Sequence, residues 1–261
     1  MSRAKILLGL AVVAAVLSLV FLPRGGEPED DATTARSITL YGYDDQDPLW
    51  EIRAEDGRIE EDGQTLRGIA IDFHRADGER LRIRGDQLDR SEGSARLSGG
   101  VRIERTDDLQ LETDALTWIE ADERLESGPI VLSTETLRVT AAQFGYDLSD
   151  DVASFGGGVD AHADLDATWT IRADRAEERD GIITFDGDVT ADSAEGESFR
   201  CRQLEVDPEA ESVRLVGDAE GEYASARLYA ALIRIDSDGL WASGRVSAQM
   251  DLEEMGASDG P

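Results

Sequence analysis

The segment "VRIERTDDLQLETDALTW", residues 101–118, decides the fold class. Its apolar residues alternate with charged or polar neighbours: Val101, Ile103, Leu109 and Leu111. A period of two predicts a β-strand with one apolar face and one solvated face. The same alternation occurs in "IAIDF" at 69–73 and in "LRIRGDQL" at 81–88. Long apolar patterns with a helical period are missing after residue 37, so we predict an all-β fold there.

Turn signals recur along the chain at a nearly constant distance. Glycines in matching apolar contexts are 27–32 residues apart: Gly68, Gly100, Gly128, Gly158, Gly187, Gly217 and Gly244. We predict units of about 30 residues, each made of two or more short strands joined by polar turns. One such unit cannot bury its apolar face alone, whereas a stack of units forms a continuous core.

A short motif occurs twice at a larger distance. "WEIRA" at 50–54 returns as "WTIRA" at 169–173, so Trp50 and Trp169 are 119 positions apart, close to four of the smaller units. The chain therefore carries either two related bundles or one long bundle with a repeated start. Both tryptophans share a strand face with an isoleucine, either capping a core or lining the mouth of an apolar groove.

The N-terminus predicts a membrane anchor. Residues 6–22, "ILLGLAVVAAVLSLVFL", contain no charge, which fits a short membrane-spanning helix. Arg3 and Lys5 precede this stretch and place residues 1–5 in the cytoplasm. No small-residue cleavage site follows, which favours an uncleaved anchor over a signal peptide. We expect a flexible tether at 23–37, an acidic disordered tail at 251–261, and a single-pass inner-membrane protein with its bulk in the periplasm.

The charge balance excludes one class of partner. The chain has 57 acidic against 26 basic residues, a formal net charge of −31. Nucleic acid binding needs a basic face, so we expect no nucleic acid partner. The acidic surface keeps an apolar fold soluble, or alternatively reflects adaptation to high salt. Cys201 is the single cysteine, so an internal disulfide is impossible.

Catalytic patterns are missing from the sequence. His74 and His162 have no metal-like partner at helical or hairpin spacing. The chain also lacks a Gly-x-Ser-x-Gly motif, zinc-binding cysteine pairs and a phosphate-binding loop. We therefore expect a protein that is not an enzyme, with no catalytic residues, no metal site and no cofactor. A tethered structural or adhesive β-solenoid is one function class that these absences leave open.

Two segments carry a resemblance to a known family. "WEIRAEDGRIEEDG" at 50–63 and "ARLSGGVRIERTDDLQLETDALTW" at 95–118 follow a membrane anchor and a tether. This combination resembles the LptC family of the lipopolysaccharide export ABC transporter, and the OstA-like β-jellyroll that LptC shares with LptA. The resemblance covers the chain from the anchor to about residue 135, and more loosely 160–250.

The resemblance implies an elongated antiparallel β-jellyroll, in an OstA-like region at 38–158 and a second at 159–250. It implies a periplasmic protein that binds lipopolysaccharide acyl chains in an apolar groove and passes them on. The implied partners are the membrane subunits of the transporter and an LptA-like bridge protein that pairs with an edge strand. The candidate groove lining combines this implication with the alternation: Trp50, Ile52, Ile69, Ile71, Leu81, Ile83, Val101, Ile103, Leu109 and Leu111.

Overall fold

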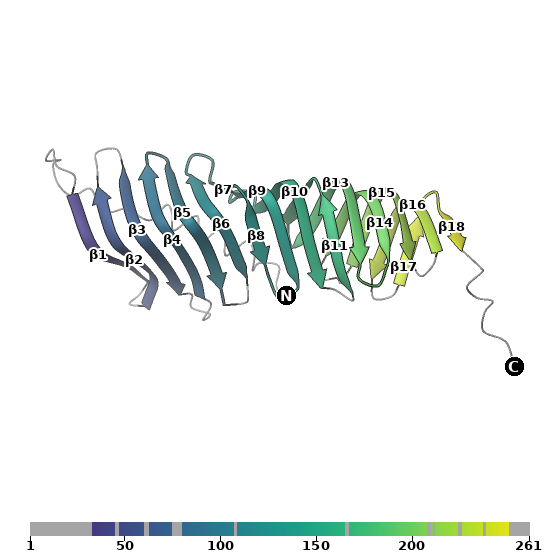
Figure 1. The fold of residues 1–261 in the computed structure, drawn as a ribbon, viewed down its shortest axis with the longest axis horizontal. Coiled ribbons are helices and arrows are strands. Elements are labelled where there is room, and N and C mark those ends of the chain that lie inside the picture. Colours follow the sequence, from purple (N-terminus) through teal and green to yellow (C-terminus); the bar gives the residue numbers. More distant parts are fainter. Residues whose placement is uncertain are drawn as a thin grey trace. The chain divides into compact units, whose positions relative to one another are not determined.

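A computed structural model describes the larger part of the chain beyond the N-terminal segment. The described residues are 33–44, 47–59, 63–74, 80–106, 109–164, 167–207, 210, 212–223, 226–236 and 239–250. They form 18 β-strands and no helix, and the recorded strand pairs are antiparallel (Figure 1). The prediction of an all-β antiparallel fold is confirmed. No helix among these residues is long and apolar enough to cross a membrane, and the predicted anchor at 6–22 lies outside them.

The described residues divide into two compact units after Phe155. The N-terminal unit contains nine complete strands and the start of a tenth. The nine are β1 (Thr33–Asp44), β2 (Asp47–Ile59), β3 (Gln64–His74), β4 (Arg80–Ser91), β5 (Ser94–Arg105), β6 (Gln110–Ile119), β7 (Arg124–Ser127), β8 (Ile130–Ser133) and β9 (Leu137–Asp147).

The division falls within β10 (Val152–Asp164), most of which belongs to the C-terminal unit. The remaining strands of that unit are β11 (Thr168–Ala173), β12 (Arg175–Arg179), β13 (Ile182–Ser193), β14 (Ser198–Asp207), β15 (Ser212–Tyr223), β16 (Ala226–Asp236), β17 (Gly239–Ser243) and β18 (Ser247–Met250). In each unit, long neighbouring strands are also consecutive in sequence, as in a meander.

Tight turns join the strands where the sequence supplies turn residues. Arg179 and Ile182 face each other as the last pair of β12 and β13, leaving a loop of Asp180 and Gly181. Both loop residues have positive φ, 53° and 80°. A type I′ turn needs positive φ at both central positions, and the Asp-Gly sequence favours it. The local sequence therefore fixes the register of this hairpin.

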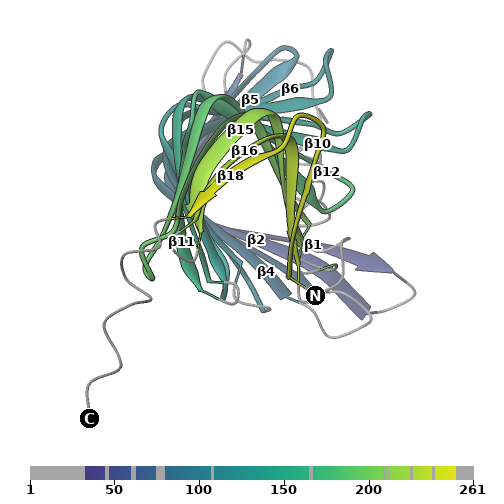
Figure 2. The same cartoon turned by 90° about the vertical axis from the view of Figure 1, so that its right-hand side faces the viewer.

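The long strands bend in the middle at β-bulges. Gly99 and Gly100 interrupt β5 with φ of 84° and 63°, and the pairing with β6 shifts between Ser98 and Val101. In the C-terminal unit, Gly187 and Gly217 have φ of 83° at the equivalent shifts in β13 and β15. A bulge inserts one residue, bends its strand and increases the local twist. Figure 2 shows the resulting curvature in β15 and β16.

The recurring glycines are predicted from the sequence as turns between strands, but most of them lie inside strands. Five of the seven lie inside strands: Gly68, Gly100, Gly158, Gly187 and Gly217. Gly128 and Gly244 instead separate β7 from β8 and β17 from β18. At Gly128 the neighbouring strand β6 is continuous, and it pairs first with β8 and then with β7. The repeated glycine thus marks the line along which each sheet bends, and the acid-rich segments form the turns.

Candidate functional site

Five of the predicted lining residues form one cross-strand row in the N-terminal unit. Directly paired positions on successive strands bring together Ile52, Ile71, Ile83, Ile103 and Leu111. The same row continues through Leu132 on β8 and Val139 on β9. All seven side chains are at most 3% exposed. At about 4.8 Å between strands, this isoleucine row extends over about 29 Å of sheet.

The other predicted residues lie next to the isoleucine row. Trp50 and Leu81 both pair with Phe73, one step further along the strands, and Trp50 is half-buried. Ile69 faces Gly85 and Val101 faces Thr113, at the bend of the sheet. Leu109 lies in the turn before β6 and accepts a hydrogen bond from the backbone N–H of Arg105 at 2.9 Å. The structure therefore brings all ten predicted residues to one apolar region.

A second apolar row lies beyond the bend, and the sequence prediction missed it. Pairing across β3 to β6 aligns four leucines, and the row ends at Phe144 on β9: Leu66, Leu88, Leu97, Leu116 and Phe144. None of these side chains is more than 4% exposed. We call it the leucine row. The alternation that identifies the first row also runs through "SARLSGG", so the signal was present in the sequence.

Burial of both rows follows from the bend. A flat single sheet would leave its apolar face in water, whereas its two halves can cover each other when the strands fold over. The outward residues between the buried ones stay in contact with solvent, as Arg82 and Arg102 do. Burying one isoleucine or leucine side chain contributes about 1.5–3 kcal/mol, so the rows are the main source of stability in this unit.

The C-terminal unit has a comparable interior with smaller side chains. One row joins Ala176, Phe185, Leu204, Leu215 and Ile233 across β12 to β16. A neighbouring row carries Ile171, Ala191 and Phe199, which faces Gly221. A side chain at Gly221 would collide with the Phe199 ring, because its Cβ would lie 2.1 Å from Phe199 Cδ1. Glycine is required there, and the aromatic ring fills the interior.

Cys201 lies in this second interior. It pairs with Val189 in the sheet and its side chain is buried. Burial raises the pKa of the Cys201 thiol to about 11. The thiolate, the reactive form, is therefore nearly absent at neutral pH. Cys201 acts as a small apolar residue.

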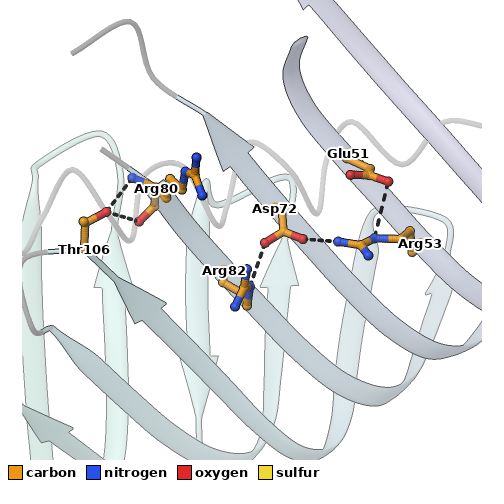
Figure 3. Close-up of polar contacts among 6 residues, drawn as sticks. All are labelled: Glu51, Arg53, Asp72, Arg80, Arg82 and Thr106. Atoms are coloured by element: carbon orange, nitrogen blue, oxygen red, sulfur yellow. Dashed lines mark hydrogen bonds and ion pairs between the residues drawn. The ribbon is translucent and has the colours of Figure 1, made fainter. Parts of the chain in front are cut away.

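The outer face of the N-terminal unit carries an ion-pair network around Asp72 (Figure 3). Asp72 on β3 accepts a hydrogen bond from Arg82 Nε at 2.7 Å, and its other carboxylate oxygen accepts one from Arg53 Nη2. Arg53 Nε also lies 3.4 Å from Glu51 Oε1. Burial alone would raise the pKa of Asp72, but the hydrogen bonds and charges of the two arginines outweigh it. The pKa of Asp72 therefore lies below its usual value.

We expect Asp72→Asn to destabilise the protein by about 1–2 kcal/mol at pH 7, since two charge-assisted hydrogen bonds are weakened. The lowered pKa gives this contribution a pH dependence. It is complete above the unfolded pKa of about 3.9 and is lost as the pH falls through the lower folded pKa. Urea unfolding at pH 7 and at pH 3 measures it, and the difference between variant and wild type should shrink at pH 3.

Asp218→Asn is the matched control, because the Asp218 carboxylate pairs with Arg202 but is 87% exposed. Exposed pairs contribute little, so we expect a change within about 0.5 kcal/mol. An equal loss for Asp72→Asn at both pH values would show that packing, and not charge, is responsible.

Large apolar side chains are exposed near the first and last strands of the described chain. Tyr41 on β1 is 51% exposed, Trp241 on β17 is 63% exposed and Val246 before β18 is 50% exposed. β1 pairs with β2, whereas β17 and β18 pair with β16. Terminal strands can accept a further strand from a partner by β-augmentation.

The described residues include no group of three or more His, Cys, Asp or Glu side chains placed to hold a metal ion. His162 Nδ1 lies 3.2 Å from the hydroxyl of Thr170, on the neighbouring strand. His74 is half-buried at the end of β3.

Comparisons with known proteins find similarity among solved structures. No family model matches the sequence, and no curated protein matches it. Among solved structures, the chain is similar to LptH, the LptA homologous periplasmic component of the conserved lipopolysaccharide transport device from Pseudomonas aeruginosa. The match covers 66% of this chain and 94% of that chain, with 9% identity and a TM-score of 0.33. At this identity, the role of an individual residue is not transferable between the two chains.

Proposed function

We propose that this protein is a membrane-anchored periplasmic component of lipopolysaccharide export. In this proposal its apolar interior binds the acyl chains and passes the lipid to the next component. The observation that carries it is the isoleucine row, which crosses β2 to β9 with isoleucine, leucine or valine at every position. The resemblance of residues 50–63 and 95–118 to the LptC family supports the same assignment.

The physical need for such a surface is large. Each methylene group of an acyl chain that enters water costs about 0.8 kcal/mol, so a lipid with several chains does not diffuse freely between membranes. A uniform apolar row offers nearly equal affinity at each step, and movement along it then needs little energy. Direction must come from a partner, because the sequence contains no phosphate-binding loop of an ATPase.

Entry of an acyl chain requires the two halves of the bent sheet to separate. The isoleucine row is buried, whereas Trp50 beside it is half-buried. In this proposal, Trp50 lies at the entrance and moves aside when the lipid enters. The partners are the membrane subunits of the transporter and an LptA-like bridge protein, which would pair with a terminal strand such as β17 or β18.

A tethered structural rod is the second candidate, and the complete burial of the isoleucine row favours it. A closed interior of that kind would stabilise a rod without admitting any ligand. Copurification with transporter subunits after mild detergent extraction would support the transport function.

Photo-crosslinking from two adjacent positions separates the two candidates. Ile103 faces the interior and Arg102 faces outward on the same strand, because successive side chains alternate. We expect a photoreactive residue at Ile103 to label lipopolysaccharide in intact membranes at least about tenfold more than one at Arg102, since only Ile103 reaches the acyl chains. Labelling at Arg102 alone, or at neither position, would support the structural rod.

A further inference from the structure

The outward face of β4 carries a line of arginines. In the segment "RLRIR" at 80–84, the leucine and the isoleucine are buried in the interior, so the three arginines face outward and are exposed. Side chains at every second position of a strand lie on one face, about 6.6–6.8 Å apart. We call Arg80, Arg82 and Arg84 the arginine stripe. It stands out in a chain with 57 acidic and 26 basic residues.

The arginine stripe is occupied at its centre and open at both ends. Arg82 is held by the carboxylate of Asp72 (Figure 3). Arg80 bonds to Thr106 only through its backbone N–H and C=O groups. Within the described part of the chain, the guanidinium groups of Arg80 and Arg84 have neither a hydrogen bond nor an ion pair. Each offers five N–H donors, and their Cα atoms are about 13 Å apart along the strand.

A further arginine lies beside the Arg84 end of the stripe. Arg84 is directly opposite Arg102 on β5, and on its other side it faces Ala70 on β3. No acidic side chain therefore faces Arg84 directly from either neighbouring strand. Like charges directly opposite each other in a sheet are destabilising. The pair becomes favourable when a carboxylate lies between the two guanidinium groups.

The acidic residues around the stripe lie lower on the surface than the arginines. The side chains of Asp72 and Glu104 are 12% and 34% exposed, whereas those of Arg82 and Arg102 are 44% and 52% exposed. A partner that approaches this face therefore meets guanidinium groups first. The net charge of −31 opposes adhesion of the whole molecule to an anionic membrane, whereas a short segment of a protein contacts only the local charges.

We propose that the arginine stripe binds an extended segment of a partner protein that has acidic residues at every second position. In an extended chain these carboxylates lie on one side, with the same spacing as the arginines. One carboxylate lies between Arg84 and Arg102, and another binds Arg80, both through charge-assisted hydrogen bonds. This docking surface lies on the outer face of the sheet, apart from the apolar interior and from the terminal strands. It does not depend on lipid binding.

Fluorescence anisotropy with the full chain and two synthetic peptides tests the proposal. Both peptides carry the same rhodamine label and have the same composition. One contains the sequence Glu-Thr-Glu-Thr-Glu and the other Glu-Glu-Glu-Thr-Thr, which turns one carboxylate to the opposite side. At low ionic strength, where exposed charges are weakly screened, we expect the alternating peptide to bind about fivefold more tightly.

Variants of the arginine stripe give the second test. Arg80→Gln and Arg84→Gln should each weaken binding of the alternating peptide about two- to fivefold, as for one exposed charge pair. Arg202→Gln is the matched control, because it removes one positive charge from an exposed ion pair in the other unit. It should leave the affinity unchanged.

Folding stability separates a binding role of Arg84 from a structural one. Arg84→Glu places an acidic side chain opposite Arg102, and opposite charges at paired positions stabilise a sheet. We therefore expect this variant to raise the urea midpoint of unfolding and to weaken peptide binding more than Arg84→Gln does. A lower midpoint together with weaker binding would show that Arg84 acts through the structure of the sheet, and would overturn its assignment.

The other outcomes are equally decisive. Equal affinity for the two peptides, or no binding of either, overturns the proposal, because the spacing of the arginines is then not recognised. An equal effect of Arg202→Gln and Arg84→Gln would assign the binding to net charge and not to the stripe. Vesicles of phosphatidylglycerol are the remaining probe. If they bind the wild type, lose binding in Arg84→Gln and compete with neither peptide, the face is a lipid contact and the protein partner is ruled out.

Discussion

Replacing Ile83 by alanine is expected to lower the free energy of unfolding by about 2–5 kcal/mol. Ile83 is fully buried at the centre of the isoleucine row, directly between Ile71 and Ile103. The substitution removes most of a buried side chain and leaves a space that close-packed neighbours fill only in part. Urea unfolding followed by tryptophan fluorescence measures the loss as a lower transition midpoint.

Ile182→Ala provides the control with the same chemistry. Ile182 begins β13 and is 36% exposed, so its truncation removes less buried surface than that of Ile83. We expect a loss of no more than about 1 kcal/mol, because the site is open to solvent on one side. Similar losses for Ile83→Ala and Ile182→Ala would mean that the isoleucine row does not dominate the stability of its unit.

The isoleucine row shows what local alternation predicts. Val101 and Ile103 alternate with charged residues, which is sufficient to assign an inward and an outward face without knowing any partner strand. The alignment of Ile52, Ile71 and Ile83 in one row is different, since it depends on the register between strands. Register arises from turn lengths and strand pairing together, and local alternation specifies neither.

The leucine row was missed because a positive-φ glycine has two structural uses. "LSGGV" at 97–101 fits a turn that ends one strand, and it equally fits a bulge that bends a continuous strand. Only the neighbouring strand distinguishes them, here by pairing with both Leu97 and Val101. Leu97 and Val101 therefore belong to one strand and cover opposite sides of the bend.

The surroundings of Asp72 and Trp118 could not be predicted from local sequence patterns either. Asp72 is one of 57 acidic residues, and nothing in "IAIDF" distinguishes it from the others. Its significance comes from Arg82, paired opposite it on β4, and from Arg53 on β2. Likewise, "LTWIE" at 116–120 predicts an inward Trp118 but not an indole without a partner. Both observations require the register and the side-chain packing.

The bend itself can be tested with three glycine-to-alanine substitutions that differ in backbone and in space. Gly187 in β13 has φ of 83°, and an added Cβ would lie 2.4 Å from Asp174 Oδ2 and 2.9 Å from Asp174 Cβ. The variant therefore combines a left-handed backbone with a collision. We expect Gly187→Ala to lose about 2–4 kcal/mol, because both costs exceed the gain from a stiffer unfolded chain.

The other two glycines separate these contributions. Gly100 has φ of 63° and open space around the added Cβ, so Gly100→Ala should lose only about 1–2 kcal/mol from the backbone. Gly128 has open space without a positive φ, and Gly128→Ala should be neutral or stabilise by up to about 1 kcal/mol. Urea unfolding of the three variants should therefore give losses in the order Gly187, Gly100, Gly128. Equal losses at Gly187 and Gly128 would contradict a bend that depends on left-handed glycines, because only Gly187 requires one.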